Sequence, residues 1–319
     1  MNLNLAHLHM LLNHVPTVGT GIAIALLVLA LVRKSEDLKR VTLEAFFVIA
    51  LLTIPAYLTG VAAQAEIEGR FEVSDVLIEA HEDAAAFAFV LMQLTGGFAW
   101  LALWQMRRMG RHGRTTMAVI LLLSALTLAV TARAATLGGE IRHPEIVGAD
   151  AATIAAEAQL ATDPPLISAN GLGRQMTDLI WLWPASEALH FIGMWLLFGI
   201  ILVVNLRMLG FMKSVPFSAV HRLLPWAALG FALNVITGML FVSSTPGQYA
   251  LNVSFHWKVL MILIAGVNLL YATAFEGPWW VGAGQSPPLR VKLMAVTSIA
   301  SWLGVMYFGR MLPFIGNAF

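Results

Sequence analysis

The sequence predicts an all-α, polytopic membrane protein with eight transmembrane helices, arranged as two pseudo-repeated four-helix bundles. The chain is 59% hydrophobic and only 12% charged, whereas soluble domains are about 25% charged. Its apolar stretches reach the length of about 20 residues that a bilayer-spanning helix needs. A series of histidine, arginine and Thr-Gly landmarks also recurs in the same order in the two halves of the chain.

Eight apolar stretches of spanning length follow one another along the chain. They predict helices at residues 15–33, 43–64, 84–106, 116–136, 187–208, 223–243, 256–275 and 291–309. The N-terminus lacks the basic region and the small-residue cleavage site of a signal peptide, so none is expected. Three parts are therefore predicted: an N-terminal four-helix bundle over 1–137, a connecting segment over 138–183 and a C-terminal four-helix bundle over 184–319.

The connecting segment is the longest soluble piece and is expected to lie outside the membrane, where it offers a docking surface. Residues 148–160 have a helical composition, and Asp163-Pro164-Pro165 ends that predicted surface helix. Trp181 and Trp183 are expected to anchor the entry of the fifth span at the membrane interface.

The distribution of basic residues predicts the orientation. One set of alternate loops is rich in lysine and arginine, whereas the other set is acidic or neutral. Under the positive-inside rule the basic loops are cytoplasmic. We therefore predict a multi-pass protein of the bacterial inner membrane with both termini in the periplasm, in contact with lipid. The net charge of +1 gives no indication of a nucleic-acid partner.

The internal repeat places two histidines in each half. His14 and His81 are 67 residues apart, and His190 and His256 are 66 residues apart. With the predicted topology, all four lie at or just inside the starts of the first, third, fifth and seventh spans. The first series runs His14, Arg33, Thr59-Gly60, His81 and Arg133, and the second runs His190, Arg207, Thr237-Gly238, His256 and Arg310.

These paired histidines predict haem ligation. In an up-and-down four-helix bundle the first and third helices lie diagonally across the core, so histidines at similar depth face each other. Haem iron is commonly held by imidazole, which predicts one haem between His14 and His81 and a second between His190 and His256. The alternative for each histidine is an interfacial residue bonded to water or to a carbonyl.

Glycines and arginines complete the predicted sites. Gly60 and Gly238 allow a flat ring to approach the backbone closely, although Thr-Gly pairs also serve ordinary packing. Arg133 and Arg310 are predicted to bind propionates, for which bidentate cations are suited. The alternative is that these arginines form structural ion pairs with the nearby carboxylates of Glu79, Glu82 and Glu187.

The absence of cysteine narrows the cofactor. The chain contains none, which excludes covalent c-type haem attachment, thiolate-bound iron–sulfur clusters and disulfides. The predicted cofactor is therefore non-covalent haem b, two per chain. The competing cofactor is a copper or zinc ion, since imidazole suits both metals. The histidines that would hold such an ion are His7, His9, His14, His81 and His143.

Two short signatures resemble known families. His7-Leu-His-Met-Leu-Leu-Asn-His14-Val-Pro, with Ile78-Glu-Ala-His81-Glu, resembles a family of bacterial four-helix membrane proteins of unknown function. Glu187-Ala-Leu-His190-Phe-Ile-Gly, with Leu206-Arg207-Met-Leu-Gly, Leu224-Pro-Trp and Thr237-Gly238, resembles a second uncharacterised bacterial membrane family. These resemblances imply two four-helix membrane units fused in tandem and carry no activity. The likeness to cytochrome b rests on the bundle and the paired histidines alone.

The predicted function is that of a membrane-embedded b-type haem electron-transfer subunit near the periplasmic face. It would pass electrons between quinol or a redox partner and a periplasmic carrier, such as cytochrome c or a larger redox complex, and need not be an enzyme by itself. The alternatives are a haem-free transporter, a copper- or zinc-handling membrane protein, and a structural subunit of a membrane complex. Transporters usually place their sites near the bilayer midplane, in broken helices, and Pro55 is the only proline well inside a predicted span.

Overall fold

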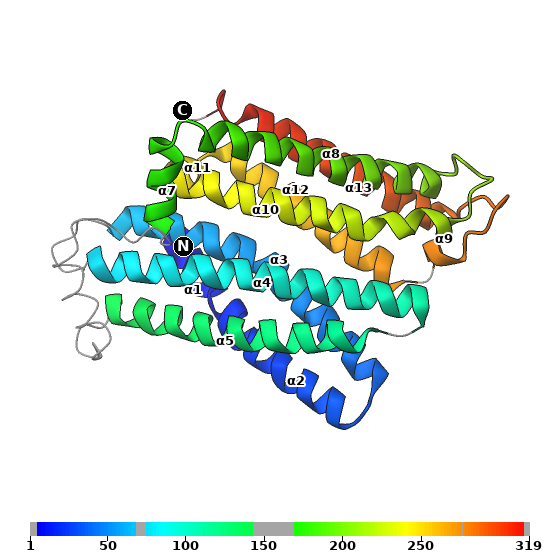
Figure 1. Cartoon of the computed structure of the whole chain (residues 1–319), viewed down its shortest axis with the longest axis horizontal. Helices are drawn as coiled ribbons and strands as arrows, with labels where there is room; N and C mark the ends of the chain where they lie inside the picture. The colour runs from blue at the N-terminus through cyan, green and yellow to red at the C-terminus, as the bar shows by residue number, and fades with distance from the viewer. Residues whose placement is uncertain (1–4, 68–74, 111, 143–168, 276, 316–319) are drawn as a thin grey trace. The chain divides into compact units, whose positions relative to one another are not determined.

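The protein is a multi-pass α-helical membrane protein. The computed structural model describes residues 5–67, 75–110, 112–142, 169–275 and 277–315, and no β-strand occurs among them (Figure 1). Eight helical segments of this described part are long and apolar enough to cross a membrane, which confirms the predicted spans. They are Leu5–Val32, Glu36–Gln64, Asp75–Met109, Arg114–Ile141, Leu182–Leu209, Phe217–Ser244, Val253–Ala274 and Leu289–Met311.

The helices form two compact units. The first unit comprises Met1–Gly96, Ala118–Trp183 and Leu240–Ala250, and the second comprises Gly97–Met117, Pro184–Met239 and Leu251–Phe319. The predicted division into bundles over 1–137 and 184–319 with a connecting segment over 138–183 stays a prediction. Within that segment, the predicted surface helix at 148–160 lies outside the described residues.

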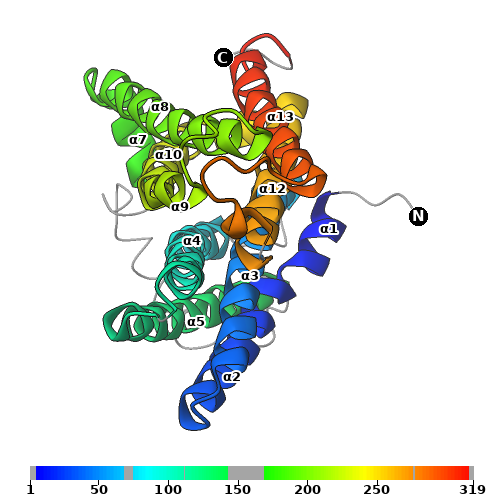
Figure 2. The same ribbon diagram turned by 90° about the vertical axis from the view of Figure 1, so that its right-hand side faces the viewer.

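The first span is a helix with a local irregularity. Its parts α1, the π-helical turn η1 and α2 follow one another, and Pro16 lies in the π-helical turn. Proline removes a backbone donor, which explains the change in winding at this point. Both α1 and α2 pack against α3, and Figure 2 shows α1 beside α3.

Six elements lie wholly in the first unit: α1 (Leu5–Leu12), η1 (Val15–Gly19), α2 (Thr20–Val32), α3 (Glu36–Ile67), α7 (Ala169–Asp178) and α11 (Pro246–Ala250). The first part of α4 (Asp75–Met109) and most of α5 (Arg114–Arg142) also belong to it.

Small residues bring the helices of the first unit together. A Cβ atom built on Gly96 of α4 would collide with the Cβ of Ala50 in α3, so these two helices cross in close contact. Deeper polar side chains are satisfied within the unit, since the hydroxyls of Thr95 and Thr127 lie 3.1 Å apart. Small side chains and hydroxyl contacts of this kind stabilise helix pairs where lipid supplies no hydrophobic driving force.

The second unit shows the same close packing. Gly193 of α8 and Gly230 of α10 meet at a crossing where a Cβ on either would lie within 2.9 Å of the other's carbonyl oxygen. Helix α12 packs along α13, as Figure 2 shows. The Asn252 side chain caps α12 by accepting from the backbone N–H of Ser254. The elements are α8 (Leu182–Leu209), α9 (Phe217–Val220), η3 (His221–Leu223), α10 (Leu224–Ser244), α12 (Val253–Ala274), η4 (Gly277–Trp280) and α13 (Leu289–Met311).

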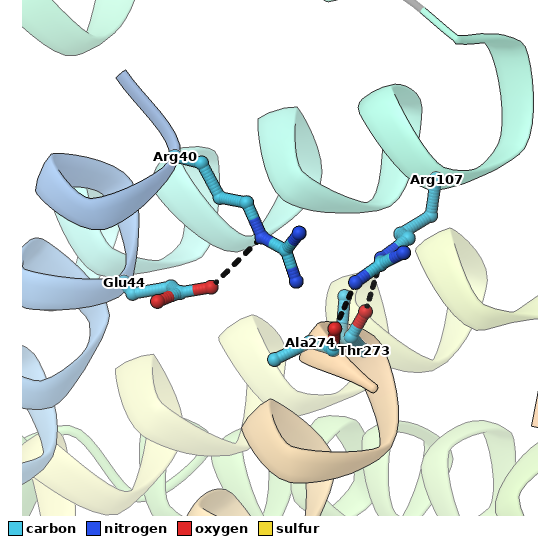
Figure 3. Close-up of polar contacts among 5 residues, drawn as sticks. All are labelled: Arg40, Glu44, Arg107, Thr273 and Ala274. Carbon is cyan, nitrogen blue, oxygen red and sulfur yellow. Dashed lines mark hydrogen bonds and ion pairs between the residues drawn. The ribbon is translucent and has the colours of Figure 1, made fainter. Parts of the chain in front are cut away.

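Each unit has an arginine that is bonded near a helix end (Figure 3). In the first unit, Arg40 Nε lies 3.1 Å from the Glu44 carboxylate on the next turn of α3. In the second unit, Arg107 donates to the carbonyl of Thr273 at 2.9 Å and to that of Ala274, the last residues of α12. Because a helix C-terminus carries unsatisfied carbonyls and partial negative charge, a cation there is stabilising.

Candidate functional site

His9 of α1 lies on the buried face of the first span. That face presents Pro16, Thr20, Ala23 and Leu27 at alternating spacings of four, three and four. Extending the pattern by seven residues from Pro16 toward the N-terminus leads to His9, which is partly buried. The spacing that defines the packed side of a helix therefore turns His9, and not His14, toward the helices of the first unit.

His9 is anchored to α3. Its Nδ1 lies 2.9 Å from the backbone carbonyl oxygen of Ala56. The ring rests on Gly60, where an added Cβ would lie only 2.9 Å from the Cε1 atom of His9. The group that lies against Gly60 is therefore an imidazole of this chain, and the approach of a cofactor ring to this glycine stays a prediction.

His81 of α4 repeats the arrangement on α5. Its Nδ1 lies 2.8 Å from the carbonyl oxygen of Ala134, and a Cβ on Gly138 would lie 3.1 Å from its Cε1. In both places the glycine follows the accepting residue by four positions. A helical carbonyl already bonds the N–H four residues on. Because that residue is glycine, no side chain covers the second lone pair of the carbonyl.

These contacts fix the protonation of both rings. A carbonyl oxygen only accepts, so each Nδ1 must carry the hydrogen, and the Nε2 of a neutral ring then has a lone pair. Neither Nε2 has a hydrogen-bond partner among the residues that the structure describes. Two imidazoles from different helices of the first unit thus each offer an unused nitrogen donor.

The second unit contains a related histidine. His190 Nδ1 lies 2.8 Å from the Thr237 hydroxyl, which donates its own hydrogen to the Leu233 carbonyl at 2.8 Å. When the hydroxyl hydrogen goes to Leu233, the hydroxyl accepts from Nδ1–H and His190 has the same tautomer as His9 and His81. Gly238 is farther away, because a Cβ there would lie 4.0 Å from the Cε1 of His190.

Lys258 is a cationic residue inside a span of the second unit. A Cβ on Gly309 of α13 would lie 3.5 Å from the Lys258 Nζ and 3.6 Å from its Cε. Lys258 lies one helical turn after the buried Ser254 and seven residues before the buried Ala265 on α12. It therefore occupies the packed face of its helix.

The other predicted ligands are exposed. His14 lies at the solvent- or lipid-facing side of the first span, where its Nδ1 contacts the Met10 carbonyl of its own helix at 3.0 Å. His256 is exposed on α12. The structure thus packs His9 and Lys258, and not His14 and His256, against neighbouring helices. The proposed ligand roles of His14 and His256 stay predictions.

The two predicted propionate-binding arginines are exposed as well. Arg133 makes no ion pair with Glu79, Glu82 or Glu187 in the described part of the chain. Arg310 lies 5.8 Å from the centre of the Phe314 ring, also without such an ion pair. Their guanidinium groups are therefore not engaged in the structural ion pairs that were the alternative interpretation.

The predicted copper or zinc cluster is not assembled in the described residues. No group of three or more histidine, aspartate or glutamate side chains there has the arrangement of a metal site. His143, the fifth of its predicted ligands, lies outside the described part. His9 and His81 therefore remain a pair of donors.

Comparisons of the chain with protein-family models, with curated proteins and with solved structures found no match. The fold defines the class, a multi-pass α-helical membrane protein. The chemistry of the His9–His81 pair then carries the functional inference.

Proposed function

We propose that this protein is a b-type haem electron-transfer subunit of the bacterial inner membrane, acting near the periplasmic face. The observation that carries the proposal is the His9–His81 pair, in which both Nδ1 atoms bond backbone carbonyls and both Nε2 atoms lack a protein partner. Histidines that bind metals usually hold a carbonyl or carboxylate through the second ring nitrogen, which orients the ring and increases its basicity.

The donor set fits haem b in chemical terms. Two neutral imidazoles are a common axial pair for haem iron, and cysteine-free chains hold such haem without covalent bonds. Gly60 and Gly138 remove the side chains that would displace the two rings. The bound haem would supply a one-electron carrier, while the protein residues hold its ligands and keep the rest of the site apolar.

His9, His81 and the surrounding helices have separate tasks. The carbonyls of Ala56 and Ala134 keep each Nδ1 protonated, so that Nε2 is the nitrogen available to iron. The partly buried position of both rings near the starts of α1 and α4 favours exchange with quinol at the membrane interface or with a periplasmic cytochrome c or larger redox complex. The exposed guanidinium of Arg133 is a partner for a propionate.

The test is haem content in ligand variants purified in detergent. His9→Ala and His81→Ala should each abolish the haem of the first unit, because either change removes one of its two axial donors. His14→Ala is the matched control, since His14 belongs to the same span but is exposed, and it should retain the full haem content. Loss of haem in His14→Ala with full haem in His9→Ala would reject the assignment.

The alternative functions make different predictions for the same proteins. A copper or zinc carrier would yield colourless protein whose metal content falls in His9→Ala and His81→Ala. A transporter or a structural subunit would stay colourless and lose neither pigment nor metal in these variants. Each alternative is therefore separated from the haem proposal by one absorption spectrum and one metal analysis.

A further inference from the structure

Two loops of the second unit are joined by a buried arginine. Arg207, near the end of α8, is fully buried. Its Nε donates to the carbonyl of Val215, in the loop after α8, and its Nη2 donates to the carbonyl of Gly282, in the loop before α13, at 2.8 Å. The backbone N–H of Gly284 also donates to the carbonyl of Lys213 at 2.7 Å. The two loops therefore form one surface at this end of the unit.

The charge of Arg207 is not neutralised by a carboxylate of the described residues. Its Nη1 is buried and makes no hydrogen bond, and none of its nitrogens forms an ion pair in the part of the chain that the structure describes. The sequence of the second unit has acidic side chains only at Glu187, at the opposite end of α8, and at Glu276, which lies outside the described residues. A buried charge without a counter-ion is costly, so this end of the unit favours a bound anion.

Three further cations lie on the joined loops or next to them. Lys213 belongs to the loop after α8, and Arg290 and Lys292 lie in the first turn of α13. A Cβ on Gly210 would lie 4.0 Å from the Lys292 Cε, so this side chain lies against the residue that follows α8. None of the three forms an ion pair within the described ranges. Cations gathered in this way produce a positive potential that attracts anions.

Large apolar side chains are exposed beside these cations. Phe211 precedes Lys213 by two residues and is 61% exposed, and Leu289 precedes Arg290 and is 70% exposed. Exposed apolar groups of this kind mark surfaces that contact membranes or other partners. A ligand that satisfies both features has an anionic head and apolar chains, whereas free phosphate would use the cations alone. The combination is the chemistry of an anionic phospholipid.

We propose that Lys213, Arg290 and Lys292 bind the phosphate head group of an anionic phospholipid, on a surface whose two loops Arg207 holds together. Basic residues beside membrane spans recognise acidic lipids, and each lysine or arginine near the surface increases the affinity about fivefold. The proposal does not depend on a haem in either unit. It gives the second unit a lipid partner that supplies the negative charge missing from its own sequence.

Lipid binding to the full-length protein in detergent tests the proposal. Native mass spectrometry measures the affinities for dioleoyl phosphatidylglycerol and dioleoyl phosphatidylcholine, which differ only in the head group. The wild-type protein should bind phosphatidylglycerol roughly 100-fold more tightly, because three cations contribute about fivefold each. Lys213→Gln and Lys292→Gln should each weaken phosphatidylglycerol binding about fivefold and leave phosphatidylcholine binding unchanged.

The matched control is Lys34→Gln, which removes an exposed cation from a basic loop of the first unit, next to Glu36 and Asp37. This variant should bind phosphatidylglycerol with wild-type affinity. Equal affinities of the wild-type protein for the two lipids, or an equal loss in Lys34→Gln and Lys292→Gln, would overturn the proposal. Inorganic phosphate at the same concentration should not displace the lipid, and displacement by it would overturn the lipid assignment in favour of a site for free anions.

Discussion

At the scale of single residues, the site depends on the missing side chains of two glycines. An imidazole reaches the carbonyls of Ala56 and Ala134 only because the residue four positions later has no Cβ in its path. The Thr-Gly repeat in the sequence identified Gly60 and Gly238 but missed Gly138 and Gly309, because the latter two are not part of a Thr-Gly pair. A search for Gly four residues after a small residue would have found Gly138.

Gly60→Ala should weaken haem binding in the first unit. The new Cβ would lie 2.9 Å from Cε1 of His9, so the ring must move away from the Ala56 carbonyl. Overpacking of this kind costs about 1–3 kcal/mol, which corresponds to a roughly 5- to 150-fold lower affinity. The control is Gly238→Ala, whose Cβ would lie at an ordinary 4.0 Å from His190. Equal haem affinities in the two variants, measured by competition with apomyoglobin, would contradict this account.

Tyr249 should lose its phenol proton only at a pH well above that of an exposed tyrosine. It lies between two spans, and burial raises its pKa to about 12, above the usual value of about 10. A raised pKa means that the folded protein holds the phenol proton more tightly than the unfolded chain. The corresponding stability is present below pH 10 and is lost as the pH rises toward 12. In an absorbance titration at the tyrosinate band, Tyr249→Phe should form one phenolate fewer than the wild-type protein near pH 12 and the same number near pH 10. A variant that forms one phenolate fewer already near pH 10 would contradict the burial of this residue.

At the scale of helices, the sequence predicted all eight spans but not which histidines face inward. Length and hydropathy determine whether a segment crosses the bilayer, and these properties are local. Which side of a helix packs against its neighbours depends on the register of the buried residues along it. The predicted start of the first span at residue 15 left His9 outside the helix, whereas the helix begins at Leu5. Extending the spacing of the buried Pro16, Thr20 and Ala23 back by seven residues would have selected His9.

The same argument explains the difference between His256 and Lys258. Equal distances along the chain suggested His256, since it matches His81 in the repeat. The buried positions Ser254 and Ala265 place Lys258 on the packed face and His256 off it. The register of the helix therefore separates these two residues where the count of residues between landmarks does not, because that count tolerates an offset of one or two positions while a helix face does not.

Adjacent glycines in α4 provide a test of helix packing. Gly96→Ala should destabilise the first unit by about 1–3 kcal/mol, because its Cβ meets Ala50 across the α3–α4 crossing and neither backbone can yield cheaply. Gly97→Ala should be neutral or stabilising by up to about 1 kcal/mol, since nothing lies within 4 Å of its Cβ position and alanine favours helix. Thermal unfolding in detergent measures both. A lower melting temperature for Gly97→Ala than for Gly96→Ala would contradict the packing.

At the scale of the whole molecule, the loops should follow the positive-inside rule. The chain contains no cysteine, so a single introduced thiol reports orientation without background. Ser214→Cys lies in the exposed loop after α8, and Asp178→Cys lies in the exposed end of α7. A membrane-impermeant maleimide should label Asp178→Cys on intact spheroplasts and Ser214→Cys only after permeabilisation. The reverse pattern would invert the proposed orientation and place the His9–His81 pair on the cytoplasmic side.

The most direct test of the central claim is the dithionite-reduced minus oxidised absorption spectrum of the wild-type protein, produced with ample haem, together with a pyridine haemochrome determination. We expect a sharp b-type α-band and two haems per chain, one in each unit. A colourless protein with an unperturbed fold would contradict the haem proposal for the His9–His81 pair and would favour a transport or structural role.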